Sequence, residues 1–329
     1  MIDLHCHMLP GIDDGPTELE TALEMARVAV ADGITLTACT PHIYPGLFEN
    51  DASSISAAAE AFRLQLREAG IPLEITTGAD IQIVPELLDG LKSGRFPCLH
   101  GSRYFLFEPP HHTVPPRFLD TIFDALSAGF VPVITHPERL TWLDDKHYGW
   151  FVEAARQGAW IQVTAGAVTG RFREQPQYWA ERFLDDGLVH LLATDAHHFQ
   201  RRPPLLAEAR KAAAKWVGPE EAERLVLDRP RAIIADQETG SVIPPRGLGG
   251  PEWQGKGAET RGGWRVVFPL VPGKIRLVKF KKTGPFRKVP LLPFIIGGSN
   301  ARGDHRSPSV PGSSVCHWSR HEAVVPCPA

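Results

Sequence analysis

The chain has 329 residues, of which 43% are hydrophobic and 22% are charged, a composition typical of one large folded domain or two ordinary ones. It contains no run of eighteen apolar residues, and its first residues lack the basic and apolar regions of a signal peptide. We therefore expect neither a membrane span nor secretion. Five cysteines are too few for a disulfide framework, which favours a reducing compartment, the cytoplasm.

The net charge of −3 conceals two unlike parts of the chain. Residues 1–245 hold 21 basic and 34 acidic side chains, whereas residues 246–329 hold 14 basic and 4 acidic ones, with 13 glycines and 10 prolines. We expect a folded domain over residues 1–245 and a basic, disordered tail over residues 246–329. A second small domain and translation from a shifted frame are the alternatives for the tail. Its basic run at 279–288 predicts at most nonspecific attraction to anions, not specific nucleic-acid binding.

Short apolar runs alternate with helical patterns through residues 1–245. In chain order, the expected strands are residues 2–5, 34–40, 73–77, 104–107, 131–135, 160–163 and 189–194. The expected helices are residues 17–31, 52–69, 118–128, 148–157, 178–186 and 204–216. Thr17 is expected to cap the first helix, and Gly33 to end it. About seven such βα units without a glycine-rich nucleotide motif favour a closed barrel over an open doubly wound sheet.

Histidine and carboxylate side chains follow nearly every expected strand. His5 and His7 are two residues apart on a strand, so both imidazoles can face one ion, and Asp3 on the same face is expected to orient a ligand. The other strand ends supply His42, Asp80, Glu108, His136, Asp195 and His197. In a barrel these positions meet at the carboxyl ends of the strands, where such folds keep their active sites.

This set of ligand types indicates a metal site. Imidazoles and carboxylates without cysteine suit manganese, iron, zinc or magnesium, and so many ligands imply two or three ions with carboxylates free to bridge them. Such a site polarises a phosphoryl oxygen and activates water, which indicates phosphoester hydrolysis by direct water attack. Arg139 and Arg202 follow two of the strand ends and are expected to hold phosphate oxygens, a packed surface arginine being the alternative for each.

Other chemistries lack their signatures. None of Cys6, Cys39 and Cys98 is followed six residues later by the arginine that a cysteine-dependent phosphatase requires. Neither a GxSxG elbow nor a GxxxxGK[ST] loop occurs. Six further histidines within residues 1–245 are assigned to structure or surface: His100, His111, His112, His147, His190 and His198. Of these, His198 is the nearest alternative to His197 as a ligand.

Seven motifs in order resemble those of the polymerase-and-histidinol-phosphatase (PHP) superfamily: MIDLHCHMLPGIDDG, CTPH, GAD, FEPP, THPER, LVHLLATDAH and RRPPLLAEA. They are most similar to its CpsB/YwqE-like branch of bacterial tyrosine-protein phosphatases, which is associated with capsule and exopolysaccharide synthesis. The resemblance runs from residue 1 to about residue 235. It implies an α/β fold, a distorted (β/α)7-type TIM-like barrel, with a three-metal site usually supplied with manganese.

The resemblance also implies residue roles and a substrate. The implied metal ligands are His5, His7, His42, Asp80, Glu108, His136, Asp195 and His197. Glu108 would bridge ions, Asp14 would act as acid or base beside the leaving phenolate or contact a metal, and Arg139 and Arg202 would hold phosphate. The implied substrate is phosphotyrosine, often on the tail of a membrane tyrosine autokinase that drives polysaccharide polymerisation and export. The oligomeric state is left open.

Two departures and three alternatives accompany the resemblance. Better-known members have glutamate at the position of Asp80, whose shorter side chain would bind one ion where glutamate spans two, and the tail after residue 245 is unusual. A phosphoesterase for a small metabolite such as histidinol phosphate would share the same ligands. An amidohydrolase would need a lysine where Asp80 and Glu108 stand. A non-catalytic partner of the kinase would not need a nearly complete ligand set.

Overall fold

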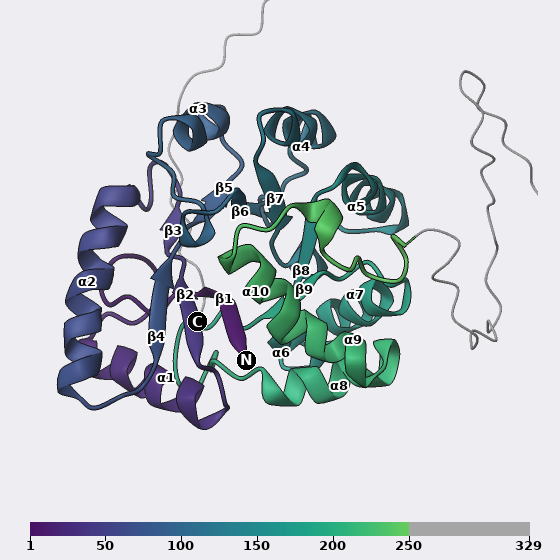
Figure 1. The fold of residues 1–329 in the computed structure, drawn as a ribbon. Helices are drawn as coiled ribbons and strands as arrows, with labels where there is room; N and C mark the ends of the chain where they lie inside the picture. Colours follow the sequence, from purple (N-terminus) through teal and green to yellow (C-terminus); the bar gives the residue numbers. More distant parts are fainter. Residues whose placement is uncertain (250–329) are drawn as a thin grey trace, which may run out of the picture. The chain divides into compact units, whose positions relative to one another are not determined.

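The computed structural model describes residues 1–249, with parallel strands at the centre and helices around them (Figure 1). The strands are β1 Ile2–Cys6, β2 Leu36–Cys39, β3 His42–Ile43, β4 Glu74–Thr77, β5 Asp80–Gln82, β6 Tyr104–Glu108, β7 Val131–Ile134, β8 Trp160–Thr164 and β9 Leu191–Ala193. They form two parallel sheets with the orders β1-β2-β4 and β3-β5-β6-β7-β8-β9. Mixed α/β architecture with parallel pairing is thereby confirmed.

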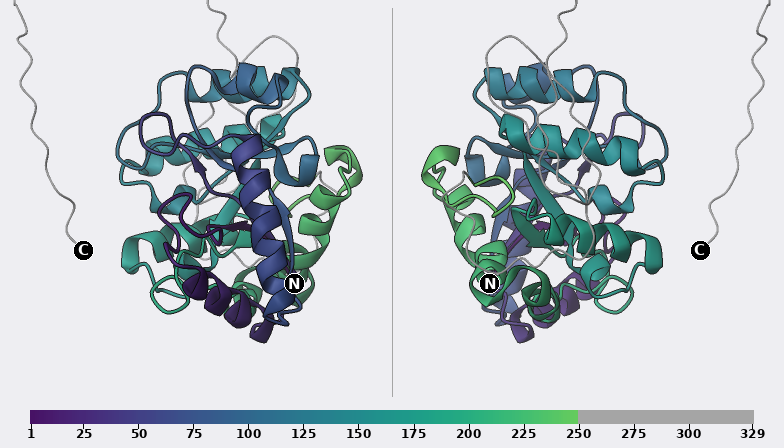
Figure 2. Two further views of the ribbon diagram at one scale, coloured as in Figure 1. Left: turned by 90° about the vertical axis from the view of Figure 1, so that its left-hand side faces the viewer. Right: turned by 90° about the vertical axis from the view of Figure 1, so that its right-hand side faces the viewer.

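The helices fill the connections between strands, and Figure 2 shows the same arrangement from two sides. They are α1 Leu19–Ala31, α2 Ala52–Glu68, α3 Leu87–Lys92, α4 Phe118–Ser127, α5 Asp145–Gln157, α6 Ala165–Val168, α7 Glu174–Asp185, α8 Ala207–Val217, α9 Pro219–Glu223 and α10 Arg229–Ile234. Glu18 precedes α1 in an extended conformation without a side-chain cap, so the predicted cap by Thr17 is wrong. Gly33 follows α1 with φ +87°, as the pattern predicted.

Two strands are interrupted just where they approach the site. β3 follows β2, and β5 follows β4, after gaps of two residues each. The backbone N–H of Asp80, the first residue of β5, donates to the carbonyl of Pro41, which lies between β2 and β3 (3.1 Å). Beyond β1, the N–H of His7 donates to the carbonyl of Ala196, which lies beyond β9 (2.9 Å). The second bond links the first and last strands. Because the described strands form two sheets, the closed (β/α)7 barrel stays a prediction.

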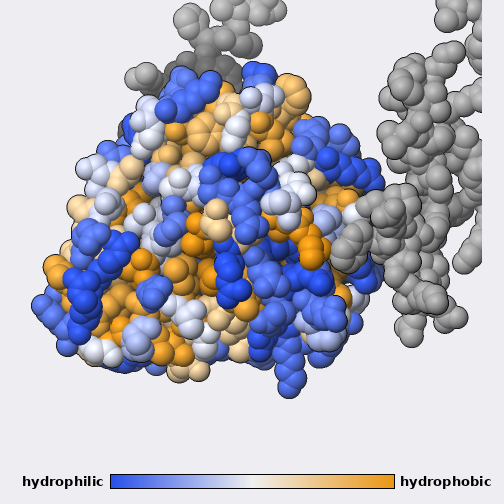
Figure 3. Space-filling model, viewed as in Figure 1, coloured by the Kyte–Doolittle hydropathy of each residue, from blue (hydrophilic) through white to orange (hydrophobic). Residues whose placement is uncertain are grey.

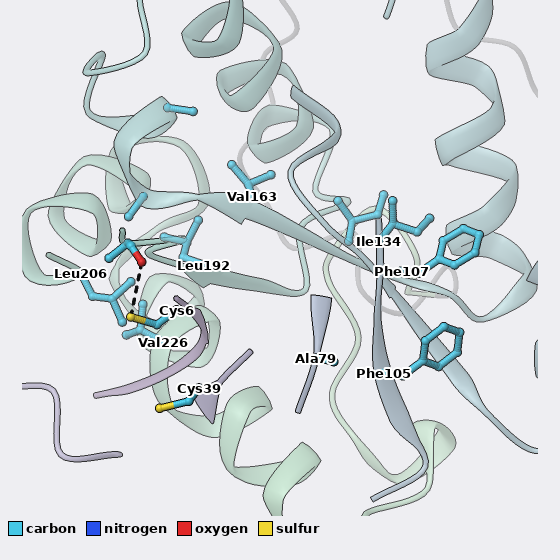
Figure 4. Close-up of a cluster of buried hydrophobic side chains, with 14 of the residues drawn as sticks. Cys6, Cys39, Ala79, Phe105, Phe107, Ile134, Val163, Leu192, Leu206 and Val226 are labelled. Carbon is cyan, nitrogen blue, oxygen red and sulfur yellow. Dashed lines mark hydrogen bonds between the residues drawn. The ribbon is translucent and has the colours of Figure 1, made fainter. Parts of the chain in front are cut away.

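Alternation along the strands separates the core from the site. Tyr104 and Leu106 of β6 join one hydrophobic cluster, whereas Phe105 and Phe107 join another, which packs against the helices and is drawn in part in Figure 4. Side chains of a strand point alternately to its two faces. Glu108, the next residue on the Tyr104 face, therefore points away from the helices and toward the functional site.

The last described residues pack against the end of α7. Arg246 donates to the carbonyl of Asp185 (2.6 Å), and the N–H of Gly247 donates to the carbonyl of Gly187 (3.0 Å). A Cβ atom at Gly247 would lie 2.1 Å from the carbonyl oxygen of Asp186, so only glycine fits there. The rest of the predicted tail lies outside the described residues, and its expected disorder stays a prediction.

The surface of the described part mixes hydrophilic and hydrophobic residues on the face drawn in Figure 3. None of the helices within residues 1–249 combines the length and the hydrophobicity that a membrane crossing needs.

Candidate metal centre

A cavity of about 430 Å³ lies at the carboxyl ends of the strands. The predicted site residues that line it are Asp14, His42, Glu108, His136, Arg139, Asp195, His197 and Arg202. The remaining three, His5, His7 and Asp80, are buried and contact these residues from within the sheet. The fold thus brings every predicted site residue together, although β1 and β9 are far apart in sequence.

The two histidines of β1 and its end are oriented by partners that the sequence did not reveal. His5 Nδ1 donates to Gln162 Oε1 (2.8 Å), and His7 Nδ1 donates to Asp13 Oδ2 (2.6 Å). Each ring therefore keeps its Nε2 lone pair free, and the two Nε2 atoms lie 3.1 Å apart. Asp3 accepts from the backbone N–H groups of His5 (3.4 Å) and Thr194 (3.0 Å) rather than from an imidazole, and its role in orienting a ligand stays a prediction.

Asp80 is the deepest carboxylate of the centre. Its Oδ2 lies 3.3 Å from His5 Nε2, 3.5 Å from His42 Nδ1 and 3.8 Å from His136 Nε2. In the described part of the chain neither Asp80 oxygen has a hydrogen-bond donor, and His42 Nδ1 and His136 Nδ1 also have no hydrogen-bond partner. Since buried polar atoms are normally paired, this set retains bonding capacity for a cation. The aspartate reaches imidazoles from three strand ends despite its shorter side chain.

Glu108 forms the second carboxylate position, nearer the cavity. Its Oε2 lies 3.3 Å from His42 Nδ1, and its Oε1 lies 3.7 Å from His136 Nε2 and 3.6 Å from His111 Nε2. Sequence analysis assigned His111 to structure or surface, yet it belongs to the site. The only sequence signal was its position three residues after Glu108, in the loop that leaves β6 at its carboxyl end.

The rim of the cavity is made by Asp14, whose side chain is 49% exposed. Its Oδ1 lies 3.1 Å from His197 Nε2 and 3.6 Å from His42 Nε2. His197 Nδ1 donates to the carbonyl of Asp195 (3.0 Å), which turns its Nε2 toward the cavity. His198 is placed differently, because its Nδ1 accepts from the N–H of Gln200 (3.0 Å) within a turn. The choice of His197 over His198 therefore agrees with the geometry.

Asp195 connects the histidines to the two arginines. Its Oδ1 lies 3.5 Å from His5 Nε2, and its Oδ2 accepts from Arg139 and from Arg202 Nη2 (2.7 Å). The backbone of Asp195 has φ 50°, and that of His136 has φ 33°. Both angles lie in the left-handed region that residues other than glycine rarely adopt. Such strain gathers at functional sites, where the surrounding structure holds a side chain at a required angle.

Burial and charge interactions shift the pKa values of the centre's histidines in opposite directions. Burial alone would lower the pKa of His5, but Asp80 and Asp195 raise it to about 9. Burial acts likewise on His42, and Glu108 with Asp80 raises its pKa to about 10. Burial lowers the pKa of His136 to about 4. Buried carboxylates at this spacing stabilise positive charge among them, which a divalent ion supplies in place of protons.

The donor set fits divalent metal ions. Five groups place their ligand atoms within 4.8 Å of one another: His5 with His7 and Asp80, His42 with Asp80 and Glu108, Glu108 with His111 and His136, His5 with His136 and Asp195, and His7 with Asp14, His42 and His197. Imidazole nitrogen and carboxylate oxygen are ligands of manganese, iron, zinc and magnesium. Asp80 and Glu108 each belong to two groups, the arrangement expected of carboxylates that bridge neighbouring ions.

Comparison with known proteins identifies the family of this chain. Residues 1–235 match the family model for capsular polysaccharide synthesis, CpsB/CapC. The chain belongs to this family. The matched region ends one residue after α10, so it includes the whole cavity and excludes the tail.

The chain is also similar to individual proteins that are named tyrosine-protein phosphatases. The chain is 33% identical over 220 residues to tyrosine-protein phosphatase YwqE of Bacillus subtilis, covering 67% of this chain and 86% of that protein. It is 31% identical over 242 residues to tyrosine-protein phosphatase CpsB of Streptococcus pneumoniae, covering 72% and 99%. A crystal structure from work on these two proteins, described as unique metal-dependent tyrosine phosphatases, matches with a TM-score of 0.69 and 31% identity, covering 72% of this chain and 96% of that one.

Proposed function

We propose that this member of the CpsB/CapC family is a metal-dependent protein-tyrosine phosphatase of capsular or exopolysaccharide synthesis. The observation that carries the proposal is that eight imidazole and carboxylate side chains and two arginines line one cavity or contact its lining residues. The similarity to YwqE and CpsB, which covers 67% and 72% of this chain and 86% and 99% of those proteins, supports the substrate class.

The proposed cofactor is two or three divalent ions, manganese foremost, held by the imidazoles and carboxylates of the centre. When bound, such ions polarise a phosphoryl oxygen and lower the pKa of water. The unpaired oxygens of buried Asp80 support this proposal, because the protein itself supplies them with no donor. The pairs Gln162–His5 and Asp13–His7 keep the Nε2 atoms turned toward the ions.

Arg139 and Arg202 are proposed to hold the phosphoryl oxygens. Both guanidinium groups contact one carboxylate oxygen of Asp195, which fixes their position while other N–H groups remain for the substrate. Asp14 stands at the cavity rim and is proposed to exchange a proton with the leaving phenolate oxygen, with a metal contact as its alternative role.

One wall of the cavity suits an aromatic ring. The turn after β3 presents Tyr44, Leu47 and Phe48, and Pro109 and Pro110 also line the cavity. Reciprocal backbone bonds between Tyr44 and Phe48 (3.0 and 2.8 Å) hold the turn. Leu47 is 63% exposed and contributes little to the core. An apolar wall above a phosphate site favours an aryl phosphate over the charged, flexible side chain of histidinol phosphate.

The proposed partner is a phosphotyrosine protein, foremost the tail of a membrane tyrosine autokinase. A cytoplasmic location belongs to the same proposal and is supported by the free thiols of Cys6, Cys39 and Cys98. Among the described residues that line the cavity there is no lysine, which argues against an amidohydrolase.

Two measurements test the proposed function. Metal analysis of the purified protein, coupled to hydrolysis of a phosphotyrosine peptide with and without manganese, is expected to show bound divalent ions and metal-dependent turnover. The second measurement compares kcat/KM for the peptide and for histidinol phosphate. A large preference for histidinol phosphate would favour the small-metabolite alternative and refute the proposed substrate.

A further inference from the structure

Both phosphate-binding arginines lie against the same aromatic ring, that of Phe172. The guanidinium carbon of Arg139 lies 4.9 Å from the ring centroid, and that of Arg202 lies 5.9 Å from it. These distances are within the range of cation–π attraction. Phe172 does not line the 430 Å³ cavity, so it acts on these arginines from behind.

The guanidinium groups of Arg139 and Arg202 repel each other, so their proximity requires stabilising contacts. On one side Asp195 accepts from both guanidinium groups. On the other side the π-electron face of Phe172 attracts both without accepting a conventional hydrogen bond. The arginines are thereby held between a carboxylate and a ring, while the N–H groups not bound to Asp195 remain available for a bound anion.

The local backbone reserves space for the ring of Phe172. It lies in the turn between α6 and α7, where the N–H of Arg171 donates to the carbonyl of Gly166 (2.8 Å). A Cβ atom at Gly166 would lie 3.1 Å from Cε2 and Cζ of Phe172, closer than ordinary van der Waals contact. Glycine at 166 therefore allows the ring to sit beneath the arginines.

We propose that Phe172 is a positioning residue that holds Arg139 and Arg202 at the spacing needed to bind a phosphoryl group. This inference rests on the proposed function, because it assumes that the two arginines bind phosphate. Phe172 touches neither substrate nor metal in this proposal. It limits the side-chain orientations of two flexible residues, so that less conformational freedom is lost when phosphate binds.

The test measures binding of inorganic phosphate to the metal-loaded full chain by calorimetry, beside its inhibition constant and the KM and kcat for a phosphotyrosine peptide. Phe172→Leu and Phe172→Met both remove the ring, and Met keeps most of the side-chain volume. We expect phosphate binding to weaken by about 5- to 30-fold in both variants, the range of one or two cation–π contacts. KM should rise with it, while kcat changes less than about threefold.

Phe130→Leu is the matched control, because Phe130 is another half-buried phenylalanine packed on the same hydrophobic cluster. It precedes β7, at the end of that strand opposite His136. This control should lose a similar amount of thermal stability and keep full phosphate affinity. Gly166→Ala should weaken phosphate binding in the wild-type chain and add nothing in the Phe172→Leu chain, because the crowded ring is then absent.

The outcomes separate this inference from the proposed function. Wild-type phosphate affinity in folded Phe172→Met would overturn the role of the ring, even if phosphotyrosine hydrolysis is intact. Equal losses in Phe172→Leu and Phe130→Leu would also overturn it, since general destabilisation would then suffice. Phosphate binding by a wild-type chain that does not hydrolyse the peptide would refute the proposed function and leave this inference testable.

Discussion

Polar groups at the two ends of the parallel strands differ in whether the protein supplies their hydrogen-bond partners. At the amino end of β6, Asp236 accepts from the N–H (2.8 Å) and Nε (3.0 Å) of Arg103, and the hydroxyl of Tyr104 donates to the carbonyl of Gln237 (2.7 Å). At the carboxyl ends, both oxygens of Asp80 are buried without a donor. Asp236 and Gln237 are paired within the protein, whereas Asp80 retains bonding capacity for a cation.

Two buried histidines show the same contrast. His190 lies just before β9 and accepts from the N–H of Ile161 through Nδ1 (3.0 Å); burial holds its pKa well below 6.5, so it is neutral. His5 is equally buried, but Asp80 and Asp195 overcome burial and raise its pKa to about 9. Burial alone therefore does not distinguish a structural histidine from a ligand. His5 differs from His190 because two buried carboxylates lie beside its ring.

Asp80→Ala is the change with the largest expected effect. It removes the carboxylate shared by two ligand groups, so kcat/KM for a phosphotyrosine peptide should fall by about 10³-fold or more and bound metal should decrease. The paired control is Asp236→Ala at the amino end, which should change activity less than about threefold. Full metal content and turnover in Asp80→Ala would show that the centre is assigned wrongly.

Gln162→Leu tests whether the candidate metal centre depends on the hydrogen bond that orients His5. Loss of the bond to His5 Nδ1 should reduce metal affinity by about 10- to 100-fold while the fold is retained. Metal titration followed by activity gives the affinity. Gln157→Leu, at an exposed position of α5, is the control and should bind metal like the wild-type chain. Unchanged affinity in Gln162→Leu would mean that ring orientation comes from packing alone.

The pH dependence of stability tests whether His190, at the amino end of β9, is neutral in the folded chain. The folded chain keeps His190 neutral below pH 6.5, whereas the unfolded chain binds a proton there, so this residue reduces stability as pH falls. At pH 5.5 the reduction should be about 1.4 kcal/mol relative to pH 7.5. His190→Asn should remove that part of the pH dependence in urea unfolding. The same pH dependence in wild type and variant would contradict the neutral assignment.

Leu47→Ser tests whether the apolar wall of the cavity favours aryl phosphates over alkyl phosphates. Removing the exposed apolar side chain should lower kcat/KM for an aryl phosphate about fivefold, with little change for an alkyl phosphate such as glycerol phosphate. Leu64→Ser is the matched control, because Leu64 is 51% exposed on α2 and does not line the cavity. Equal losses on both classes of substrate would remove the case for an aryl-binding wall.

The smallest expected effect comes from shortening the chain. Arg246 and Gly247 contact the segment after α7, so a chain ending after Gly249 keeps these bonds. Its activity and melting temperature should match those of the full chain within experimental error. A loss of activity would show that residues 250–329 contribute to catalysis or substrate binding.

Much of the centre was predictable from sequence because each ligand ends a strand. A strand end fixes where a side chain lies along its strand, and parallel pairing brings these ends to one edge. His5, His7, Glu108 and Asp195 needed only these two rules. His111 and Asp13 were not identified as site residues because they lie in loops, whose path depends on packing rather than on periodicity.

Tertiary structure alone decided how the ligands are oriented and completed. No spacing in the sequence relates Gln162 to His5, or Phe172 to Arg139 and Arg202, since these contacts join elements that are distant along the chain. The sequence by itself determined the alternating βα order, the acidic domain and the chemistry of its ligands. Hydrogen bonds and packing that exist only in the folded chain decide which imidazole nitrogen faces the other ligand groups and where the two arginines lie.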